Sequence, residues 1–518
     1  MLACVVSGAV LGVDAYLVRV EVDLASGLPA MSVVGLAESA VREGRERVTA
    51  ALHNAGHVIP PKRITVNLAP ADVRKDGSAF DLPLAIALLA ASGQVPVAAL
   101  EGACLVGELG LDGEVRPVRG VLPIAVRCRD AGIRTLMVPH GNAREAAVVD
   151  GIDVRAVARL EDLVRHLRGE PVLPRVHARD DTAETGPAFG LDYADVKGQG
   201  TARRALEVAA AGHHNVLLVG PPGSGKSMLA RRLPGILPPL SRDEAIDVTR
   251  VCSVAGRLQP GQGLVGTRPF RAPHHTVSDA GLVGGGSSPR PGEATLAHHG
   301  VLFLDELPEF RRNVLEALRQ PMEDGFIHVG RARQSVVYPA RFMLVGAMNP
   351  CPCGFFGVGE SRCICHPGQV LRYRSRVSGP VLDRIDIHVD VPPVADHQLM
   401  TDDGGESSAG MRDRVVAARA RQLARFGGRG GVFANAQMGS RDVRAHCRLE
   451  SGGEALLRAA MRKLALSARA WHRVLRLART IADLEGVDTI ATGHVAEAIQ
   501  YRTVDRSALW SGRSHTGS

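Results

Sequence analysis

Residues Gly220–Ser227 read GPPGSGKS, a complete match to the phosphate-binding pattern G-x-x-x-x-G-K-[ST]. The apolar run VLLV precedes this motif and the helical pattern MLARRL follows it, so it lies between a strand and a helix, where the pattern belongs. The glycines let backbone N–H groups turn toward phosphate oxygens, Lys226 adds a point charge, and Ser227 is expected to hold Mg²⁺. The stretch predicts an α/β domain with an ATP site made by Gly220, Pro221, Pro222, Gly223, Ser224, Gly225, Lys226 and Ser227.

A second motif supplies the carboxylates that ATP hydrolysis needs. Gly300–Glu306 reads GVLFLDE, an apolar strand that ends in two acidic residues. Alone, such a strand end usually carries a solvated carboxylate, but about 80 residues after a complete phosphate-binding loop it predicts function. We expect Asp305 to hold Mg²⁺ and Glu306 to activate the attacking water.

The length of 518 residues favours about three domains. Residues 1–167 alternate strand-like and helix-like patterns, which predicts an α/β or α+β domain. The strand-like stretches are Ala15–Val22, Ile64–Leu68 and Thr135–Val138, and the helix-like ones are Val41–Ala55, Leu82–Ala91 and Val121–Ala131. A polar linker is expected over residues 168–188, and residues 189–395 form the ATPase core, in which strands are expected at Asn215–Val219, Gly300–Leu304 and Phe342–Ala347.

The C-terminal part is expected to be all-helical. After a polar linker over residues 396–410, amphipathic helical patterns occupy residues 411–506 and a frayed tail follows over 507–518. The patterns are Met411–Phe426, Ser440–Cys447, Gly453–Leu464, Ala468–Leu484 and Thr492–Tyr501. From Ala409 onward there are 19 Arg and Lys against 9 Asp and Glu, so this module carries +10 while the whole chain carries +8.

Composition narrows the class of protein. With 45% hydrophobic and 22% charged residues the chain is of ordinary globular type. Its longest apolar run, Leu82–Ala91, is shorter than the roughly 18 residues of a spanning helix, and no basic segment of the signal-peptide kind precedes the N-terminal stretch. We therefore expect a cytoplasmic protein. Only five of the 62 basic residues are lysines, so the net charge alone is weak support for nucleic-acid binding.

Several long motifs in the span Ala194–Val391 resemble one known family. They are, in order, ADVKGQ, GPPGSGKS, RPFRAPHH, PGEATLAHHGVLFLDELPEF, AMNPCPCG and LDRIDIHV. This order resembles the ComM/YifB family of magnesium-chelatase-like AAA+ ATPases. The resemblance covers nearly the whole chain, because that family also has a Lon-protease-like N-terminal domain (of the ribosomal S5 domain 2 type) and an all-α C-terminal lid.

The resemblance implies roles for three more residues. Asn349 in AMNP matches the polar sensor that orients the attacking water, and Arg384 in LDRID matches the arginine finger that acts on a neighbouring subunit's site. Arg469 is the best match to the second sensor arginine, with Arg473 as its competitor. A finger acting in trans implies a ring, most simply a homo-hexamer. All five of Glu306, Asp305, Asn349, Arg384 and Arg469 are thus candidate catalytic residues.

A candidate DNA contact lies just ahead of the Asn349 strand. Phe326–Pro339 has strand-like arms around a short tip that contains Arg331 and Arg333. In the ring ATPases that the chain resembles, a hairpin at this place grips DNA in the pore, although two arginines on an exposed hairpin can also serve solubility alone. The glycine-rich stretch Gly281–Pro291 is a second candidate, expected to be flexible. With only 3% aromatic residues, the chain favours contact with the DNA backbone over base readout.

Four of the nine cysteines are clustered in the pattern C-x-C-x₉-C-x-C: Cys351, Cys353, Cys363 and Cys365. Four thiolates brought together by a glycine-rich loop suit tetrahedral Zn²⁺, and such a site would be structural. Reduced or redox-active thiols are the alternative. The pair His274-His275 has no third ligand at metal spacing and is interpreted as structural or close to phosphate.

The N-terminal domain resembles a protease that has lost its catalytic pair. Lys75–Asp81 (KDGSAFD) resembles the Lon segment K-D-G-P-S-A-G, but Ala79 stands at the nucleophile position and Ser78 lies one residue early. Leu122 stands where the Lon lysine is expected, and no lysine occurs between Lys75 and Lys197. Arginine stays protonated and cannot act as the base. We expect a proteolytically inactive scaffold.

By resemblance, the chain is an ATP-dependent DNA motor of the branch-migration or helicase type that serves the integration of transforming DNA. One alternative is a chelatase-type motor that drives Mg²⁺ insertion into a porphyrin. Another is an ATP-dependent protein-remodelling scaffold that does not act on DNA. The expected cofactors are ATP and Mg²⁺, with possible Zn²⁺, and the expected macromolecular partner is single-stranded or branched DNA.

Overall fold

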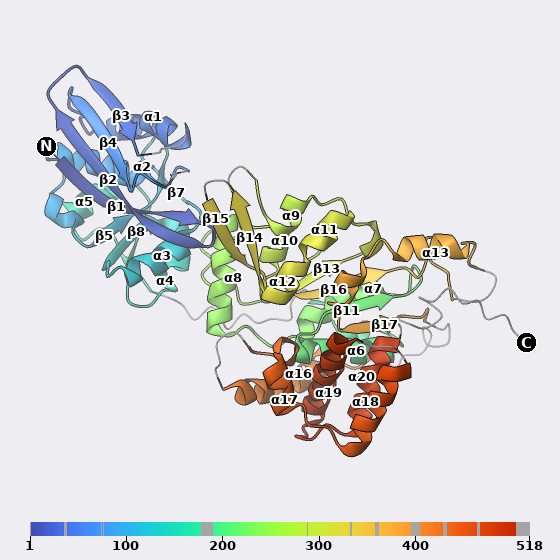
Figure 1. Cartoon of the computed structure of the whole chain (residues 1–518). Coiled ribbons are helices and arrows are strands. Elements are labelled where there is room, and N and C mark those ends of the chain that lie inside the picture. Colours follow the sequence, from blue (N-terminus) through green and yellow to red (C-terminus); the bar gives the residue numbers. More distant parts are fainter. Residues whose placement is uncertain are drawn as a thin grey trace, which may run out of the picture.

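The computed structural model describes residues 2–35, 39–73, 75, 77–177, 190–286, 289–331, 334–357, 362–394, 405–427, 432–463 and 467–503. It shows a mixed α/β protein with a central parallel sheet and a C-terminal helical region (Figure 1), as predicted. None of the described helices combines the length and the hydropathy needed to cross a membrane.

An eight-stranded mixed sheet, in the order β10-β9-β8-β5-β1-β2-β4-β3, forms the N-terminal part. Its strands are β1 (Leu2–Leu11), β2 (Asp14–Ala25), β3 (Ala30–Val34), β4 (Arg63–Ala69), β5 (Ala103–Leu105), β8 (Thr135–Pro139), β9 (Asp153–Val157) and β10 (Arg175–Val176). Side chains of β1 alternate between two buried clusters: Val5 belongs to the one with α1, α2 and α5, and Val6 packs against the one with α3 and α4. These helices are α1 (Ser39–Asn54), α2 (Asp81–Ala91), α3 (Val121–Asp130), α4 (Ala143–Ala147) and α5 (Leu160–Leu167).

The central part is a five-stranded parallel sheet in the order β12-β13-β16-β11-β17. Its strands are β11 (Val216–Val219), β12 (Phe270–Arg271), β13 (Val301–Leu304), β16 (Met343–Met348) and β17 (Ile387–Asp390). Every residue of β11, β13 and β16 is buried, because helices cover both faces of the sheet. The helices are α6 (Gly200–Gly212), α7 (Lys226–Arg232), α8 (Arg242–Ala255), α9 (Asp279–Val283), α10 (Glu293–Leu296), α11 (Arg312–Ala317), α12 (Arg319–Asp324), α13 (Pro367–Arg374) and α14 (Gly379–Leu382).

The predicted hairpin before the Asn349 strand is present as β14 (Phe326–Arg331) and β15 (Gln334–Pro339). Arg331 pairs with Gln334 at the last described position, while the Arg331 side chain and Arg333 lie outside the described residues. In the glycine-rich stretch, the described residues Gly285 and Arg290 pair through their backbones, and Tyr338 Oη donates a hydrogen bond to Pro289 O (2.8 Å). This stretch therefore contacts the hairpin directly.

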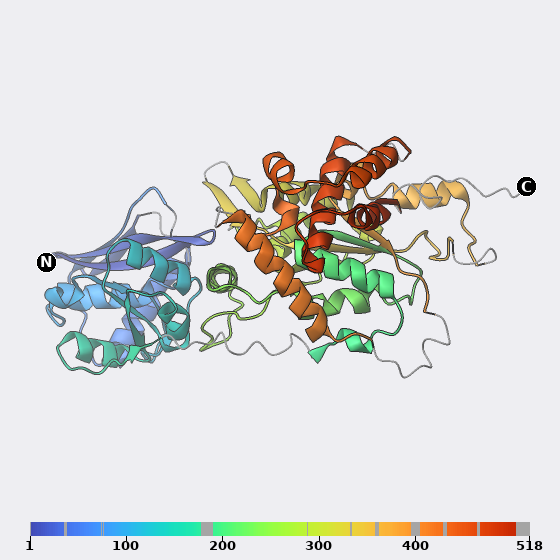
Figure 2. The same ribbon diagram turned by 90° about the horizontal axis from the view of Figure 1, so that it is seen from below.

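Among the described residues, five helices form the C-terminal region (Figure 2). They are α16 (Ser408–Phe426), α17 (Ser440–His446), α18 (Ser451–Lys463), α19 (Ala468–Glu485) and α20 (Thr492–Thr503). Of these, α16 and α19 pack on α6 and α20 packs on β17, while α17 and α18 pack on α19 and α20, respectively. A buried polar contact locks this region to the sheet: Asp386 Oδ2 lies 3.2 Å from His214 Nδ1, and His214 Nε2 lies 2.9 Å from Thr480 Oγ1 of α19. Burial opposes ionisation of Asp386, but the hydrogen bond to His214 and the charge of Arg473 hold its pKa well below the usual range.

Three segments differ from the expectations. Leu2–Leu11 is a strand that no alternating pattern marked, because both of its faces are buried. Arg175–Val176 lies in the expected linker yet pairs with β9 as an edge strand. Ser408–Gly410, also expected as linker, is the first turn of α16, because the Ser407 side chain accepts the Gly410 N–H and caps the helix. The predicted tail over 507–518 lies outside the described residues.

Candidate nucleotide-binding and catalytic site

Three predicted motifs meet at one edge of the parallel sheet. In the register of the sheet, Val219 of β11 lies beside Met348 of β16, and Leu304 of β13 lies beside Gly346. The residues that follow these strands, which include Gly220, Asp305 and Asn349, therefore emerge at the same carboxyl-terminal edge. Ligands of open α/β sheets bind at this edge.

The phosphate-binding loop has the backbone that its glycines predict. Gly223 and Gly225 have φ values of +77° and +89°, in the left-handed region that favours glycine. A side chain at Gly220 would collide with the carbonyl oxygen of Val391, so only glycine fits at the start of the loop. The loop thus forms a cradle of backbone groups of the size and polarity that a phosphate chain needs.

Lys226 lies inside this cradle. Its Nζ donates hydrogen bonds to Gly220 O (2.7 Å), Pro221 O (2.8 Å) and Asn349 Oδ1 (3.2 Å). Burial lowers the pKa of the Lys226 ammonium from its usual value, and the charge of Asp305 partly offsets that effect. The lysine therefore joins the loop to the end of β16, where Asn349 stands.

The predicted Mg²⁺ ligands are also neighbours. Ser227 Oγ donates to Asp305 Oδ2 over 2.6 Å, which brings together a hydroxyl from the first turn of α7 and the carboxylate that follows β13. Oxygen ligands of this type suit Mg²⁺, which binds one or two protein oxygens besides phosphate and water. The residues present therefore fit a nucleotide with its Mg²⁺.

Glu306 has a left-handed backbone (φ +53°), and its N–H donates to Asp305 Oδ1 over 2.9 Å. Its side chain is 58% exposed at the rim of the site, and its Oε2 lies 3.5 Å from His275 Nδ1. The His275 ring packs 4.1 Å from that of His274. His275 is thus a further residue of the site, and its contact with Glu306 was not predicted from the sequence. The sequence showed the histidine pair, but only the structure places His275 next to this carboxylate.

The two predicted arginines do not lie in this site. Asn215 Nδ2 donates to Arg384 O (3.0 Å) at the amino-terminal edge of the sheet, opposite to the phosphate-binding loop. Arg384 is nearly buried: its Nη2 pairs with Glu323 Oε1 of α12 at 2.5 Å, and its Nε has no hydrogen-bond partner among the described residues. Within one chain, Arg384 is therefore placed away from Lys226.

Arg384 lines a cavity of about 540 Å³ between the sheet edge and the C-terminal helices. Arg469 and Arg473 line the same cavity, and Arg473 Nε lies 3.5 Å from Asp386 Oδ1. The other charged or titratable lining residues are His213, Glu323, Asp324, Arg341, Asp386, His472 and Arg476. Arginines predominate, so the cavity suits an anionic group.

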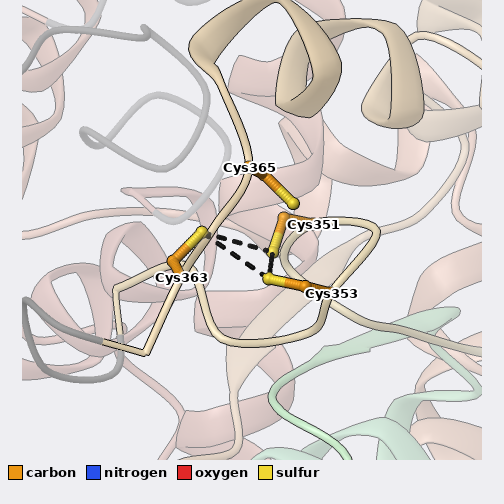
Figure 3. A group of neighbouring side chains, drawn as sticks. All are labelled: Cys351, Cys353, Cys363 and Cys365. Carbon is orange, nitrogen blue, oxygen red and sulfur yellow. Dashed lines mark hydrogen bonds between the residues drawn. The ribbon is translucent and has the colours of Figure 1, made fainter.

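The four clustered cysteines lie together directly after Asn349 (Figure 3). The Sγ atom of Cys351 lies 3.3 Å from that of Cys353 and 3.8 Å from that of Cys363, and all four Sγ atoms lie within 4.8 Å of one another. Burial opposes ionisation of Cys353, but backbone hydrogen bonds from Phe355 and Ile364 outweigh it and lower the pKa of this thiol to about 6. The four thiols are therefore arranged as a single group.

The cysteine loop also packs on the phosphate-binding loop. A side chain built on Gly354 would come within 2.5 Å of Pro222 Cδ, so the two loops touch where Gly354 has φ +88°. Arg374 of α13 holds the loop from the other side, since its Nε donates to Pro350 O (2.9 Å) and its guanidinium lies 5.0 Å from the centre of the Phe356 ring. The cysteine group is thus a direct neighbour of the nucleotide site.

In the Lon-like segment, Ser78 Oγ donates to Glu108 Oε2, and the buried Lys75 Nζ donates to Pro70 O. Leu122 is fully buried in α3. The contacts of Ser78 and Lys75 are thus with a carboxylate and a backbone carbonyl.

Comparison with known proteins gives three family matches along the chain. Profiles described as "Magnesium chelatase, subunit ChlI", "Subunit ChlI of Mg-chelatase" and "Magnesium chelatase, subunit ChlI C-terminal" match residues 192–399, 20–142 and 405–502. The chain is 45% identical to YifB of Salmonella typhimurium over 506 residues and 45% identical to Competence protein ComM of Haemophilus influenzae over 510 residues. Each alignment covers 98% of both chains. The 38 kDa subunit of magnesium chelatase from Rhodobacter capsulatus is 30% identical over 187 residues, which is 32% of this chain and 52% of that protein.

The near full-length relatives and the three profiles agree with the motifs. Membership of this AAA+ type implies ATPase activity with ATP and Mg²⁺, as in a motor protein, and proteins of this type are typically oligomeric. We conclude that the chain belongs to the ComM/YifB family of magnesium-chelatase-like AAA+ ATPases.

Proposed function

We propose that this protein is a hexameric, ATP-driven DNA motor of the branch-migration or helicase type that acts in the integration of transforming DNA. The observation that carries the proposal is the position of the β14–β15 hairpin. The hairpin follows α12, whose Glu323 pairs with Arg384, and leads into β16, which Asn349 directly follows. A force on the hairpin would therefore be transmitted to Arg384 through α12 and to Asn349 through β16, and both residues are proposed to act in hydrolysis. The alignment with a Competence protein over 98% of both chains supports DNA as that load.

In the proposed site, Lys226 and the loop backbone bind the phosphates, and Ser227 and Asp305 hold Mg²⁺, which neutralises phosphate charge when bound. Glu306 accepts the proton of the attacking water and Asn349 orients that water. Arg384 completes a neighbouring subunit's site, which explains why it lies opposite to the loop of its own chain. Two observations support binding of an anionic group there: the Arg384 Nε has no hydrogen-bond partner in the part of the chain that the structure describes, and several arginines line the cavity. Arg469 is proposed as the second sensor arginine, with Arg473 as its competitor, and both face the same anionic group.

The charge distribution supports DNA as the polymer. The C-terminal module carries +10, so the rest of the chain carries −2, and the positive field is concentrated on one part of each subunit. A magnesium-chelatase-type motor and a protein-remodelling scaffold are the competing functions. Neither of these two functions involves a polyanion that the basic tip of the hairpin could bind. In this proposal the N-terminal domain has no proteolytic activity, because its Ser78 pairs with a carboxylate rather than with a lysine.

The test is the ATPase rate with and without single-stranded or branched DNA, over a series of salt concentrations. We expect DNA to raise the rate of the wild type, and the variant Arg331→Ala/Arg333→Ala to lose this stimulation while its basal rate survives. The stimulation is expected to fall steeply with salt, because phosphate contacts release counterions. The matched control is Arg127→Ala/Arg129→Ala, which removes two exposed arginines at the same spacing on α3. A wild type that DNA does not stimulate at low salt contradicts the DNA-motor proposal.

We further propose that Cys351, Cys353, Cys363 and Cys365 hold a structural Zn²⁺. A tetrahedral site with Zn–S bonds of about 2.3 Å has S···S edges of about 3.8 Å. The Sγ separations of 3.3, 3.8 and 3.7 Å among the first three cysteines are close to this value. Because the loop touches Pro222 and follows Asn349, the ion would stabilise the nucleotide site without taking part in hydrolysis.

Elemental analysis of the purified protein is expected to find one zinc per chain and to lose it in Cys353→Ser. Cys4→Ser, which changes a half-buried cysteine far along the sequence, is the control and should retain the metal. The melting temperature should fall only in the first variant, since metal binding orders the loop. Absence of zinc, together with nine reduced thiols titrated after unfolding, would show that the group is a reduced thiol cluster.

A further inference from the structure

The turn between β1 and β2 of the N-terminal domain reaches into the core of the ATPase domain. Val13 is 8% exposed and belongs to the ATPase cluster that contains Val251 of α8 and Ile327 and Val336 of the β14–β15 hairpin. Any side chain at Gly12, which has φ +67°, would collide with Val336. Both views show the end of the long β1–β2 pair directed at β14 and β15 (Figures 1 and 2).

Polar contacts hold the turn in this position. Arg250 of α8 donates to Asp14 Oδ1 (2.5 Å) and to Val13 O (3.4 Å). Farther along α8, Gly120 N donates to Ser253 O (3.2 Å), and in the loop after it Arg144 Nη1 donates to Gly261 O (3.0 Å). Partly buried side chains of Ile246 and Leu264 pack against the N-terminal cluster with α3 and α4. The turn is therefore the end of a continuous docking surface.

The contact falls close to the hairpin tip. Val336 pairs with Val329, two residue pairs from the Arg331–Gln334 pair where the described strands end. On the same face of β15 as Val336, Tyr338 Oη donates a hydrogen bond to Pro289 O, so the glycine-rich stretch also packs on this face of the hairpin. A hairpin isolated from other strands is marginally stable, so its direction depends on what packs against its arms.

We propose that the Gly12–Asp14 turn is a strut that fixes the direction of the β14–β15 hairpin, and that stimulation of ATP hydrolysis by DNA requires it. The inference rests on the proposed DNA motor. Val13 and Asp14 act as positioning residues, because their described contacts are with the hairpin and with Arg250 of α8. The N-terminal domain thereby gains a mechanical role in place of proteolysis.

The first experiment places a charge in the contact. We expect Val13→Asp to lose DNA stimulation and to need more DNA for half-saturation, while its basal ATPase rate and its KM for ATP stay at wild-type values. Val34→Asp is the matched control, since Val34 is 48% exposed in the same domain. If Val13→Asp is stimulated like the wild type, the strut proposal is wrong.

A charge exchange keeps the proposal testable if Val13→Asp does not fold. Asp14 is exposed, so Asp14→Arg should reduce stimulation by about 1.4- to fivefold, the range of measured surface ion pairs. The double variant Asp14→Arg/Arg250→Asp should restore it, and an unchanged melting temperature and basal ATPase rate in the single variant separate loss of the strut from loss of stability. Equal stimulation of Asp14→Arg and wild type would overturn the proposal. A wild type without any DNA stimulation would instead refute the DNA motor on which the strut depends, so the two failures are distinguishable.

Discussion

Glu306→Gln is expected to bind ATP as the wild type does and to hydrolyse it about 10²–10⁴-fold more slowly, the usual contribution of a general base. The amide keeps the shape and the contact distance of the carboxylate but cannot accept the proton of the attacking water. The structure leaves the Glu306 side chain 58% exposed, so the substitution creates no buried unpaired group and should not change stability. Single-turnover hydrolysis together with equilibrium ATP binding measures both quantities.

Two further variants test whether the effect of Glu306→Gln is specific to this carboxylate. Glu309→Gln changes a nearby carboxylate that pairs with Arg376 at the surface, and we expect it to retain wild-type turnover. Lys226→Ala should lose turnover through loss of ATP binding, because Lys226 supplies the buried positive charge of the cradle. If Glu306→Gln hydrolyses ATP within tenfold of the wild type, another group is the base.

Arg384→Ala is expected to lower kcat by about 10³–10⁵ in the assembled ring, the range measured for arginine fingers. ATP binding should survive, because Arg384 lies at the opposite edge of the sheet from the loop of its own chain. The partner that it leaves, Glu323, is 51% exposed and can be solvated, so the melting temperature should change little. Arg319→Ala is the control, because it removes an arginine of α12, the helix whose Glu323 pairs with Arg384, and Arg319 itself pairs with Glu316.

Mixing two inactive proteins tests whether the finger acts in trans. Lys226→Ala carries an intact Arg384, and Arg384→Ala carries an intact phosphate-binding loop. In mixed rings, some junctions combine the two intact halves, so the mixture should regain part of the wild-type rate. A mixture that assembles and stays as inactive as its components would place the action of Arg384 within its own chain.

Motifs with local causes were predictable from the sequence. The phosphate-binding loop depends on glycines at fixed spacing, and Asp305 marks the end of an apolar strand, so both could be found without knowing which strands are neighbours. The five C-terminal helices were also found within a few residues of their ends, because their amphipathic period is local. These features needed no information about the rest of the chain.

Features that depend on tertiary contacts were not predictable. The sequence places His275 some 30 residues before Glu306, and only the pairing of β12 with β13 brings the two side chains together. β1 lacks an alternating pattern because two helical layers bury both of its faces, and β10 is two residues long and exists only through its bonds to β9. The contact of Val13 with the ATPase cluster depends on domain docking, which no local pattern encodes.

The buried contacts of Asp386 have a mechanical consequence. This carboxylate joins His214, which precedes β11, to Arg473 of α19, while Thr480 holds the same histidine from about two turns further along that helix. An ionised, fully buried carboxylate with these partners resists separation, since parting them would leave charges unpaired in the interior. We therefore expect the C-terminal helices and the central sheet of one chain to move together. In the proposed motor, the stroke driven by ATP hydrolysis is then expected to be a rotation between adjacent subunits.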